Sequence, residues 1–445
     1  MSEIPTTAGT EDERDKPARV ASGRLGLETL VVKVAIYAYG LPGSIVLART
    51  LGPGGRGAYQ VAVTTSLIVL TLVLFGMPQS QFRSWGGRRR EEMLSVARLA
   101  AILFGVLGFG VCVWVRRLGG RTFAGESGNA LVLIGASMPL QVHAACLMVL
   151  LQSAGRTRLT NAALAVSGFA QTTGILVLGL AGGLTVWTTS VTYTGGLALQ
   201  WLVLQRSSRV IGRPAPRAPI RTAATLARAG LVFQTFIVAQ LLLLRVDVLF
   251  VARIADLSEV GIYAVAVTLA ELVWLVTDSL AQVMVERATA GGESESIVVF
   301  LRAARMALVL GCAGAAAAAA LAPFAVRHLF GGDFASAAPV VGLLMPGIVA
   351  MGLWRTISPA VVRYGSIWTQ PAYSAAALVV NVGLNLYLIA PLGARGAALA
   401  SSAAYVLAGG LAARWLLRRA GFAFRTLRPG LEELRAIARL IPGLR

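Results

Sequence analysis

Residues 48–64 read ARTLGPGGRGAYQVAVT, and residues 252–268 read ARIADLSEVGIYAVAVT. The second stretch repeats the first without a gap at a displacement of 204 residues, and eight of the seventeen positions are identical. An apolar composition could explain the shared Val and Ala residues, but not the Arg, Gly, Tyr and Thr in the same register. We interpret the pair as an internal duplication. Each copy lies between two long apolar segments, so the duplicated unit is expected in a membrane.

The composition indicates a membrane protein that crosses the bilayer many times. The chain of 445 residues is 56% hydrophobic and only 13% charged, whereas soluble domains carry about 25% charged residues. One or two soluble cores could not bury so much apolar surface. Membrane-spanning strands would alternate in polarity over about ten residues, and the sequence lacks such segments.

The fold class predicted from the apolar segments is an all-α polytopic membrane protein with twelve transmembrane helices. Each segment is long enough to cross about 30 Å of hydrocarbon as a helix. The spans are expected near residues 27–48, 57–78, 94–115, 129–151, 159–181, 183–205, 228–251, 260–284, 299–322, 337–359, 371–391 and 396–418.

The charge distribution favours a membrane orientation over nucleic-acid binding. Basic residues exceed acidic residues by 20, which in a soluble protein would suggest a nucleic-acid partner. Here the arginines gather in loops 77–93 and 206–228 and in the C-terminal tail, as the positive-inside rule requires. We therefore expect contact with membrane lipids, no nucleic acid, and both termini in the cytoplasm.

The duplication divides the chain into two lobes of six helices. Pro214, Pro216 and Pro219 interrupt loop 206–228, and Pro cannot continue a helix. The repeat copies follow spans one and seven, so the lobes are parallel repeats related by an axis along the membrane normal. The expected parts are a flexible cytoplasmic tail (1–24), an N-terminal lobe (25–205), a basic cytoplasmic linker (206–227), a C-terminal lobe (228–420) and a cytoplasmic amphipathic tail (421–445).

Signatures of catalysis are lacking. His143 lies inside a predicted span and His328 at an external loop, and neither has a companion metal ligand one turn away. The three cysteines lie in apolar segments without metal spacing. The glycine-rich run 52–55 is interpreted as a turn, because no strand precedes it and no Lys-Ser/Thr follows it. We expect neither an enzyme nor a cofactor or metal.

Ionisable side chains inside the spans are the candidate functional residues, because each costs roughly 2.5–3.5 kcal/mol at the bilayer centre on insertion scales. Lys33 lies one turn before Tyr37 in the first span. Glu271 and Asp278 are seven residues apart, so their carboxylates share one stripe of the eighth span. The seventh span adds Gln234, Gln240, Arg245 and Asp247, and the tenth adds Arg355.

A cation on one lobe and carboxylates on the other would suit a cleft that binds an anion and couples its movement to a cation. Arg49 and Arg253 lie at the outer helix ends of the two repeat copies, where anchoring of the turn is favoured over substrate contact. The candidate substrate-binding residues are Lys33, Tyr37, Gln234, Gln240, Arg245 and Arg355. The candidate ion-coupling residues are Asp247, Glu271 and Asp278.

Several motifs together resemble one family. They are RTLGPGGRGAY at 49–59, LFGGDF at 329–334 with LMPG at 344–347, and NVGLN at 381–385 with IAPLGARGAA at 389–398. These motifs are similar to those of the bacterial polysaccharide (O-antigen-type) flippase family, in the superfamily of multidrug, oligosaccharidyl-lipid and polysaccharide exporters. The resemblance extends over about residues 25–420.

The resemblance implies a V-shaped transporter with a central cleft between two lobes, in the bacterial inner membrane. It also implies an activity, the flipping of an undecaprenyl-diphosphate-linked oligosaccharide from the cytoplasmic to the outer leaflet. Basic side chains line the cavity in such relatives, and Lys33 and Arg245 occupy the corresponding helices. The implied partners are the lipid-linked oligosaccharide, a coupling sodium ion or proton, and a polysaccharide polymerase or glycosyltransferases.

Two other functions stay open at the level of sequence. A cation-coupled multidrug efflux antiporter of the same superfamily would have an anionic cavity, for which Glu271 and Asp278 are candidates. A non-transporting membrane scaffold for polymer-synthesis enzymes would tolerate neutralisation of every charge inside the spans.

Overall fold

The computed structural model describes residues 11–86, 90–215, 220–288 and 292–428, and all regular structure in these ranges is helical. The α-helices are α1 (Glu11–Val73), α2 (Met77–Arg83), α3 (Arg90–Leu118), α4 (Glu126–Ala136), α5 (Met138–Ser153), α6 (Thr157–Leu180), α7 (Val186–Ser207), α8 (Ile220–Ile254), α9 (Leu257–Ala288), α10 (Glu293–Ala325), α11 (Ala337–Tyr364), α12 (Thr369–Leu392) and α13 (Ala394–Ala420).

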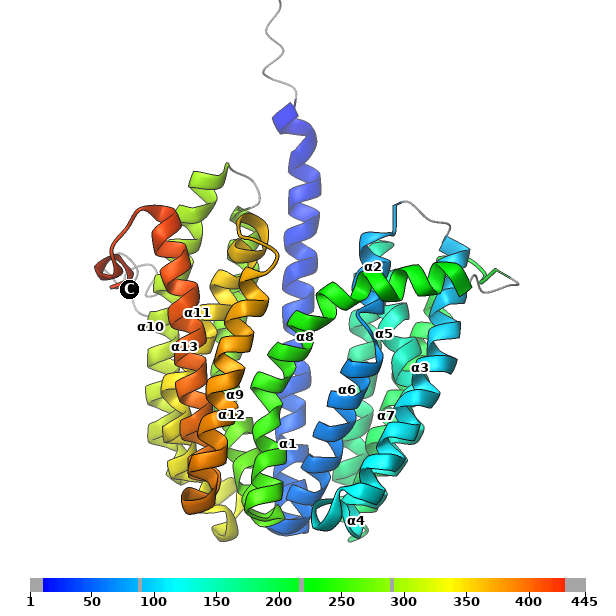
Figure 1. Cartoon of the computed structure of the whole chain (residues 1–445), viewed down its shortest axis with the longest axis vertical. Coiled ribbons are helices and arrows are strands. Elements are labelled where there is room, and N and C mark those ends of the chain that lie inside the picture. The colour runs from blue at the N-terminus through cyan, green and yellow to red at the C-terminus, as the bar shows by residue number, and fades with distance from the viewer. Residues whose placement is uncertain (1–10, 87–89, 216–219, 289–291, 429–445) are drawn as a thin grey trace, which may run out of the picture.

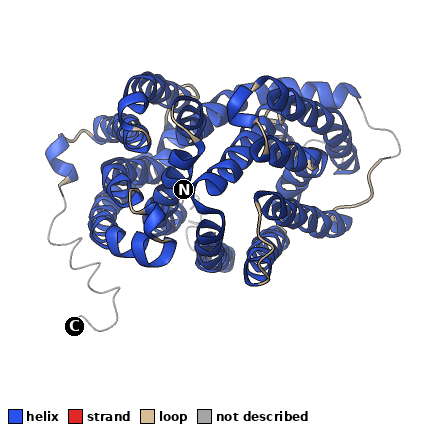
Figure 2. Ribbon diagram, turned by 90° about the horizontal axis from the view of Figure 1, so that it is seen from below, coloured by secondary structure: helices blue, strands red, loops and turns tan. Residues whose placement is uncertain are grey.

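The helices form two lobes that diverge from a common base (Figure 1). Helices α3–α7 lie in one lobe and α9–α13 in the other, and the lobes meet at the bottom of the view. We call the side where α1 begins and α13 ends the terminal side, and the other the opposite side. Seen along this axis, the two helix bundles lie next to each other, and the segment near the N-terminus projects between them (Figure 2). The predicted V shape is confirmed.

The predicted twelve spans are confirmed by the described helices. By length and hydropathy alone, nine of these helices can cross a membrane, or ten when the bent pair α4–α5 is taken as one span. Helix α1 is counted once among these helices, although the break at Gly52 divides it into two spans. Helix α7, which matches the predicted span 183–205, is less apolar than the others because Thr, Ser and Gly are frequent in its first half. Adding the second span of α1 and helix α7 to the ten gives twelve spans among the described helices.

The break in α1 has a local cause. Gly52 has φ 65° and ψ −179°, a conformation that is essentially limited to glycine because it has no Cβ. Pro53 follows, and its fixed φ suits the first position of a new helix. The sequence GPGG therefore turns the chain from the first span into the second.

Helix α8 crosses from one lobe to the other (Figure 1). Its first turns lie against α2, where the Ser80 hydroxyl donates to the Leu226 carbonyl at 2.7 Å. Gly230 and Gly76 approach so closely that a Cβ on either would overlap the other's backbone. Helix α8 already begins at Ile220, within the expected linker 206–227. Ala, Leu and Arg dominate residues 222–229, and these are strong helix formers.

The expected tails also differ from the structure. Residues 11–24, expected to be a flexible tail, belong to α1. They are rich in Glu, Arg and Ala, which favour helix. Of the expected amphipathic tail 421–445, the structure describes only the start, with a short 3₁₀ turn at Phe424–Leu427. Residues 429–445, and with them most of that prediction, lie outside the described residues.

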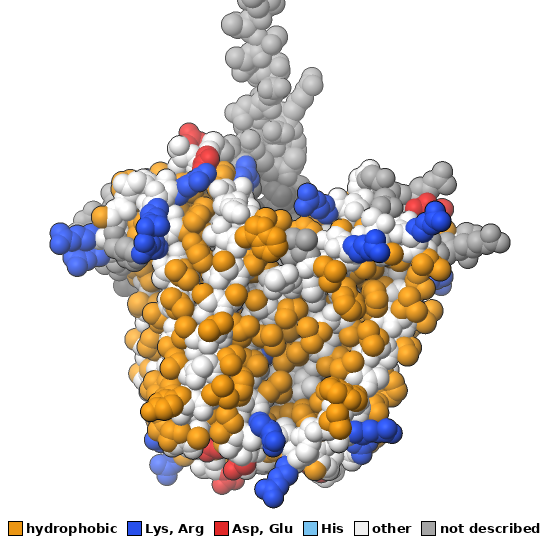
Figure 3. Space-filling view, in the orientation of Figure 1, with side chains coloured by type: hydrophobic (Ala, Val, Ile, Leu, Met, Phe, Trp, Pro, Cys, Tyr) orange, Lys and Arg blue, Asp and Glu red, His pale blue; other side chains and the backbone are white. Residues whose placement is uncertain are grey.

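The surface has the pattern of a membrane protein. Hydrophobic side chains cover a broad band around the visible face, and charged side chains gather at its two ends (Figure 3). Lys and Arg are present at both ends of this face. The band matches the hydrocarbon layer and the charged ends match the interfaces.

Candidate functional site

The two repeat copies meet at the opposite side and close the base of the V. Gly57 packs against the Leu257 carbonyl, and Gly261 packs against the Pro53 carbonyl, so closely that a Cβ on either glycine would overlap that oxygen. Pro53 and Leu257 are themselves equivalent positions of the repeat. The contact is therefore symmetric about a pseudo-twofold axis between the lobes. Each copy of the repeat thus forms half of the contact between the lobes.

A second contact closes the same side. The Arg49 guanidinium in α1 donates through Nε to the Leu329 carbonyl at 2.7 Å, and through an Nη to the His328 carbonyl. These carbonyls belong to the π-helical turn Val326–Phe330 at the end of α10. The interpretation of Arg49 as a local turn anchor is therefore wrong, since it joins the two lobes. Its hydrogen-bond partners come from a loop 279 residues away, which sequence spacing does not reveal.

A cavity of about 460 Å³ lies between the lobes. Its walls come from α1, α6 and α7 in one lobe and α8, α9 and α11 in the other. Lys33 and Tyr37 face it from neighbouring turns of α1, as predicted from their spacing. The lining residues with polar or charged side chains are Lys33, Tyr37, Ser167, Gln171, Gln200, Arg245, Glu271, Trp274, Asp278 and Arg355.

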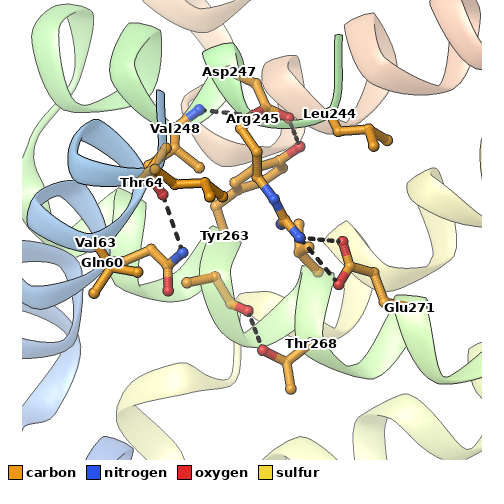
Figure 4. Close-up of a pocket in the computed structure, with 13 residues that line it drawn as sticks. Gln60, Val63, Thr64, Leu244, Arg245, Asp247, Val248, Tyr263, Thr268 and Glu271 are labelled. Carbon is orange, nitrogen blue, oxygen red and sulfur yellow. Dashed lines mark hydrogen bonds and ion pairs between the residues drawn. The ribbon is translucent and has the colours of Figure 1, made fainter. Parts of the chain in front are cut away.

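Arg245 forms an ion pair across two helices. Its Nη lies 3.1 Å from Oε1 of Glu271, and the two side chains are 27% and 20% exposed. Figure 4 shows the guanidinium of α8 extended toward the carboxylate of α9. Removal from water strengthens the attraction between the charges. Glu271 thus holds the guanidinium against one wall of the cavity.

Arg355 forms the second ion pair of the cavity. Its Nε donates to Oδ1 of Asp278 at 2.7 Å, and an Nη binds the other carboxylate oxygen. This two-point geometry is the strong form of an arginine–carboxylate contact. The guanidinium also lies 4.9 Å from the centre of the Trp274 ring, and the Trp274 indole donates to the Ile348 carbonyl at 2.9 Å. Arg355 is therefore fixed by a carboxylate and an aromatic face.

Asp247 occupies a different environment from the other two predicted ion-coupling residues. It is 1% exposed and lies inside the C-terminal lobe. It accepts hydrogen bonds from the Tyr263 hydroxyl, from the Ser401 hydroxyl at 3.0 Å and from the Val248 amide at 2.8 Å. Figure 4 shows Asp247 turned toward Tyr263 and away from the Arg245–Glu271 pair.

Two asparagines extend this buried polar cluster. Asn381 donates to the Ser401 hydroxyl at 3.3 Å, and Asn385 donates to Oδ1 of Asn381 at 2.9 Å. Both asparagines are fully buried on α12. The Oδ1 of Asn385 has no hydrogen-bond partner in the described part of the chain. The cluster therefore brings a carboxylate, a hydroxyl and amide oxygens together inside the lobe, which is a donor set suited to a small hard cation.

The two predicted glutamines do not line the central cavity. Gln234 is buried on α8, and its amide donates to the Thr71 carbonyl near the terminal side. Gln240 is half-buried on the same helix. Figure 1 shows that α8 bends along its length. The bend separates the surroundings of Gln234 from those of Arg245, although their spacing on a straight helix would place them on one face. Their part in substrate binding stays a prediction.

The N-terminal lobe contributes cavity residues that the sequence did not single out. Gln171 and Gln200 face the cavity from α6 and α7. The Gln171 amide donates to the Ser167 hydroxyl at 3.0 Å, one turn away on α6. Polar residues at positions i and i+4 of an otherwise apolar span are a signal that could have identified this pair.

Comparisons with known proteins agree on the family and the fold. The family model described as "Polysaccharide biosynthesis protein" matches residues 26–285, which is more than half of the chain. No curated protein matches the chain in sequence.

Three solved structures illustrate the shared fold. The lipid II flippase MurJ in an inward closed conformation has a TM-score of 0.75 and 14% identity, over 93% of this chain and 92% of that chain. An inward-facing multidrug resistance transporter of the MATE family and the MOP superfamily has a TM-score of 0.68 and 15% identity, over 88% and 98%. A MOP superfamily transporter from Pyrococcus furiosus, whose title notes a reversed polarity of its binding pocket, has a TM-score of 0.63 and 14% identity, over 91% and 96%.

Proposed function

The chain belongs to the polysaccharide biosynthesis protein family, and we propose that it flips an undecaprenyl-diphosphate-linked oligosaccharide from the cytoplasmic to the outer leaflet by alternating access. The main support is the cavity between the lobes, whose walls present the cations Lys33, Arg245 and Arg355 to one enclosed space. Its two carboxylates, Glu271 and Asp278, are already paired with arginines. The lining of the cavity therefore has a net positive charge and suits an anionic head group.

A polar cavity answers the physical problem of this substrate. Sugar hydroxyls and a diphosphate cannot enter hydrocarbon, because the loss of their hydration costs far more free energy than apolar surroundings return. Guanidinium groups bind phosphate oxygens through two parallel N–H groups, and the glutamines of the N-terminal lobe can hydrogen-bond to hydroxyls. The polyprenyl tail stays in the bilayer while the head group crosses between the lobes.

The lobes supply the movement. In this structure the lobes diverge toward the terminal side (Figure 1) and are closed at the opposite side through Gly57, Gly261 and Arg49. By the positive-inside rule the terminal side is the cytoplasmic side. Rocking of two parallel repeats about a fixed site would release the closed side and close the open one. The head group then changes sides without a covalent reaction.

The buried cluster around Asp247 is our proposed coupling site. A carboxylate with neighbouring hydroxyl and amide oxygens can hold sodium, and the carboxylate alone can hold a proton. Asp247 is on α8, Tyr263 on α9, and Asn381 and Ser401 on α12 and α13. A cation in the cluster would tie four helices of one lobe together and so bias the position of that lobe. Glu271 and Asp278 would act differently, as counter-charges to the arginines in the cavity.

A reconstituted flipping assay tests the proposal. Proteoliposomes would contain the full chain and a labelled undecaprenyl-diphosphate-linked oligosaccharide, whose access to an external quencher reports its leaflet. We expect the double variant Arg245→Gln/Arg355→Gln to abolish translocation, whereas Arg419→Gln, which removes a surface ion pair with Glu293, leaves it unchanged. Translocation at the wild-type rate by the double variant would remove the head-group site from the proposal.

The multidrug antiporter predicts a different result in the same vesicles. It requires unpaired carboxylates for an organic cation, whereas Glu271 and Asp278 are both within ion-pair distance of arginine. Efflux of ethidium driven by a sodium or proton gradient, with no translocation of the lipid-linked oligosaccharide, would favour the antiporter. Under our proposal, polysaccharide polymerases or glycosyltransferases are the enzymes that make or consume the flipped substrate.

A further inference from the structure

Arg56 is a buried arginine for which the described part of the chain offers no carboxylate partner. It lies in α1 just beyond the break at Gly52 and is 7% exposed. One Nη donates to the Ser44 hydroxyl at 3.2 Å, whereas the buried Nε has no hydrogen-bond partner among the described residues. A buried charge without a partner lowers stability. A role in binding would explain why a guanidinium stands in this position.

The side chain of Arg56 borders a second cavity, of about 330 Å³, between α1, α6 and α9. Tyr37, Gln171 and Glu271 line both this cavity and the central one. The two spaces are therefore neighbouring parts of one cleft. Glu271 is the acidic residue in the lining of the second cavity, and it is paired with Arg245. Arg56 is thus left as a cation available to a ligand.

The internal repeat shows that the fold does not require an arginine here. The position equivalent to Arg56, 204 residues later, is Val260. Val260 is fully buried in the core of the C-terminal lobe. The next position, Gly57 or Gly261, is the same in both copies and forms the contact between the lobes. Arg56 is therefore a departure from the repeat beside its most constrained residue, and packing alone favours the valine.

The position along α1 places Arg56 near the closed end of the cleft. Lys33, Tyr37 and Ser44 follow each other at helical spacing and line the cavities from one face of α1. The eleven residues from Lys33 to Ser44 span roughly 16 Å along the helix axis at 1.5 Å per residue. Arg56, bonded to Ser44, therefore lies about 16 Å further from the terminal side than Lys33 does. A ligand that enters near Lys33 would reach Arg56 late in its passage.

We propose that Arg56 and Ser44 form a second oxyanion subsite, which takes phosphate oxygens of the substrate at the closed end of the cleft. The Arg56 side chain borders the cavity, and the N–H groups of a guanidinium form a fork that fits a phosphate. The Ser44 hydroxyl adds a further donor. This inference rests on the proposed function, because it assumes a substrate that carries phosphate. A free anion and a lipid-linked diphosphate present the same oxygens, so the test includes both.

Binding of two probes to the purified full chain in detergent tests the subsite. The probes are inorganic pyrophosphate and farnesyl diphosphate, and their affinities are measured by calorimetry for the wild type, Arg56→Gln, Arg56→Lys and the control Arg117→Gln. Arg117 is exposed at the end of α3 on the opposite side. We expect Arg56→Gln to weaken both ligands about tenfold or more. The affinity of Arg56→Lys should lie between those of the wild type and Arg56→Gln, because lysine keeps the charge but lacks the two parallel N–H groups.

The two probes separate the sources of the anion. A lipid-linked source predicts that farnesyl diphosphate binds the wild type more tightly than pyrophosphate does, and that Arg56→Gln weakens both by a similar factor. Equal wild-type affinities, both lowered in Arg56→Gln, support the subsite with a free anion as its ligand. Affinities in Arg56→Gln equal to those of the wild type would overturn the subsite.

Thermal unfolding separates binding from a structural role. Because Arg56→Gln removes an unpaired buried charge, we expect the ligand-free variant to have a Tm equal to or above that of the wild type, and to lose the rise in Tm on adding farnesyl diphosphate. A lower Tm with unchanged affinity would make Arg56 a structural residue. If Arg56→Gln cannot be purified, wild-type affinity in Arg56→Lys overturns the fork geometry. Failure of the wild type itself to bind either diphosphate would instead contradict the proposed function.

Discussion

Gly57 and Gly261 occupy the same position of the internal repeat and pack against each other's copy, the backbone nitrogen of Gly261 lying 3.0 Å from where a Cβ on Gly57 would stand. The contact closes the opposite side of the cleft. Side chains would keep the two helix ends apart, so glycine at both positions is a condition for this closure. The repeat keeps glycine at this position although the seven positions before it, 50–56 and 254–260, all differ.

The first prediction concerns this glycine pair. Gly57→Ala should weaken the closed contact, because the new methyl group overlaps the Leu257 carbonyl and backbone must move to relieve it. Overpacking of this kind costs typically about 1–3 kcal/mol. We expect a lower Tm and a much slower flipping rate, measured by thermal unfolding and in proteoliposomes.

Gly410→Ala is the matched control for the glycine pair. Gly410 is exposed on α13, and a Cβ there meets nothing within 4 Å. Its Tm and flipping rate should stay at wild-type values. Equal Tm and rate for Gly57→Ala would show that the contact does not constrain the lobes.

The second prediction concerns the Arg49 contact. Arg49→Ala removes both hydrogen bonds to the turn after α10, so the opposite side should open more often. Spin labels on cysteines introduced at Thr50 and Leu329, in a background without Cys112, Cys146 and Cys312, would report the distance between the lobes by double electron–electron resonance.

The expected result is a distance distribution that gains a longer component in Arg49→Ala. Arg117→Ala, which removes an exposed arginine from the same side of the molecule, should leave the distribution unchanged. If Arg49→Ala gives the same distance distribution as the wild type, the Arg49 contact does not hold the opposite side closed.

Hydropathy and the repeat were sufficient to predict an all-helical chain with twelve spans in two lobes, because each span is an apolar segment of fixed length and the copies follow equivalent spans. The V shape with its central cleft was an expectation from the family resemblance. The stripe predicted for Glu271 and Asp278 also agrees with the structure, since both line the central cavity. Periodicity within one helix determines which of its residues share a face. It was therefore informative wherever both residues lay on one straight helix.

Contacts between helices could not be predicted in the same way. The pairing of Arg355 with Asp278 depends on how α11 is rotated against α9, and nearly uniform apolar spans carry little signal for that rotation. Gln234 and Arg245 have different surroundings because α8 bends, whereas a helical wheel assumes a straight helix and places Gln234 on the same face as Arg245. The sequence did not single out Arg56 for another reason. The glycine-rich sequence before it resembles a loop, and the position of Arg56 in the cleft depends on the exact place of the break at Gly52.

The third prediction concerns the competition between carboxylate and phosphate for Arg355. Asp278→Asn keeps the size of the side chain and removes its charge, so Arg355 is released to a phosphate group. We expect a several-fold gain in affinity for farnesyl diphosphate, measured by calorimetry. The pair is about one-third exposed, so the loss in stability should stay within about 1 kcal/mol. Weaker binding in Asp278→Asn would mean that the carboxylate positions Arg355 for the ligand instead of competing with it.

The last prediction concerns the buried cluster of the C-terminal lobe. Asp247→Asn preserves the shape of the side chain but removes the charge that a cation would need, while Tyr263 and Ser401 remain as hydrogen-bond partners. If the cluster is the coupling site, flipping should lose its dependence on a sodium or proton gradient. The affinity for farnesyl diphosphate should stay near the wild-type value, because the Asp247 carboxylate is hydrogen-bonded to Tyr263 and Ser401 while Arg245 is paired with Glu271. Proteoliposomes with imposed sodium and proton gradients provide the measurement, and Asp333→Asn, at an exposed carboxylate on the opposite side, is the control. A gradient dependence in Asp247→Asn equal to that of the wild type would place the coupling elsewhere, with Glu271 and Asp278 the next residues to test.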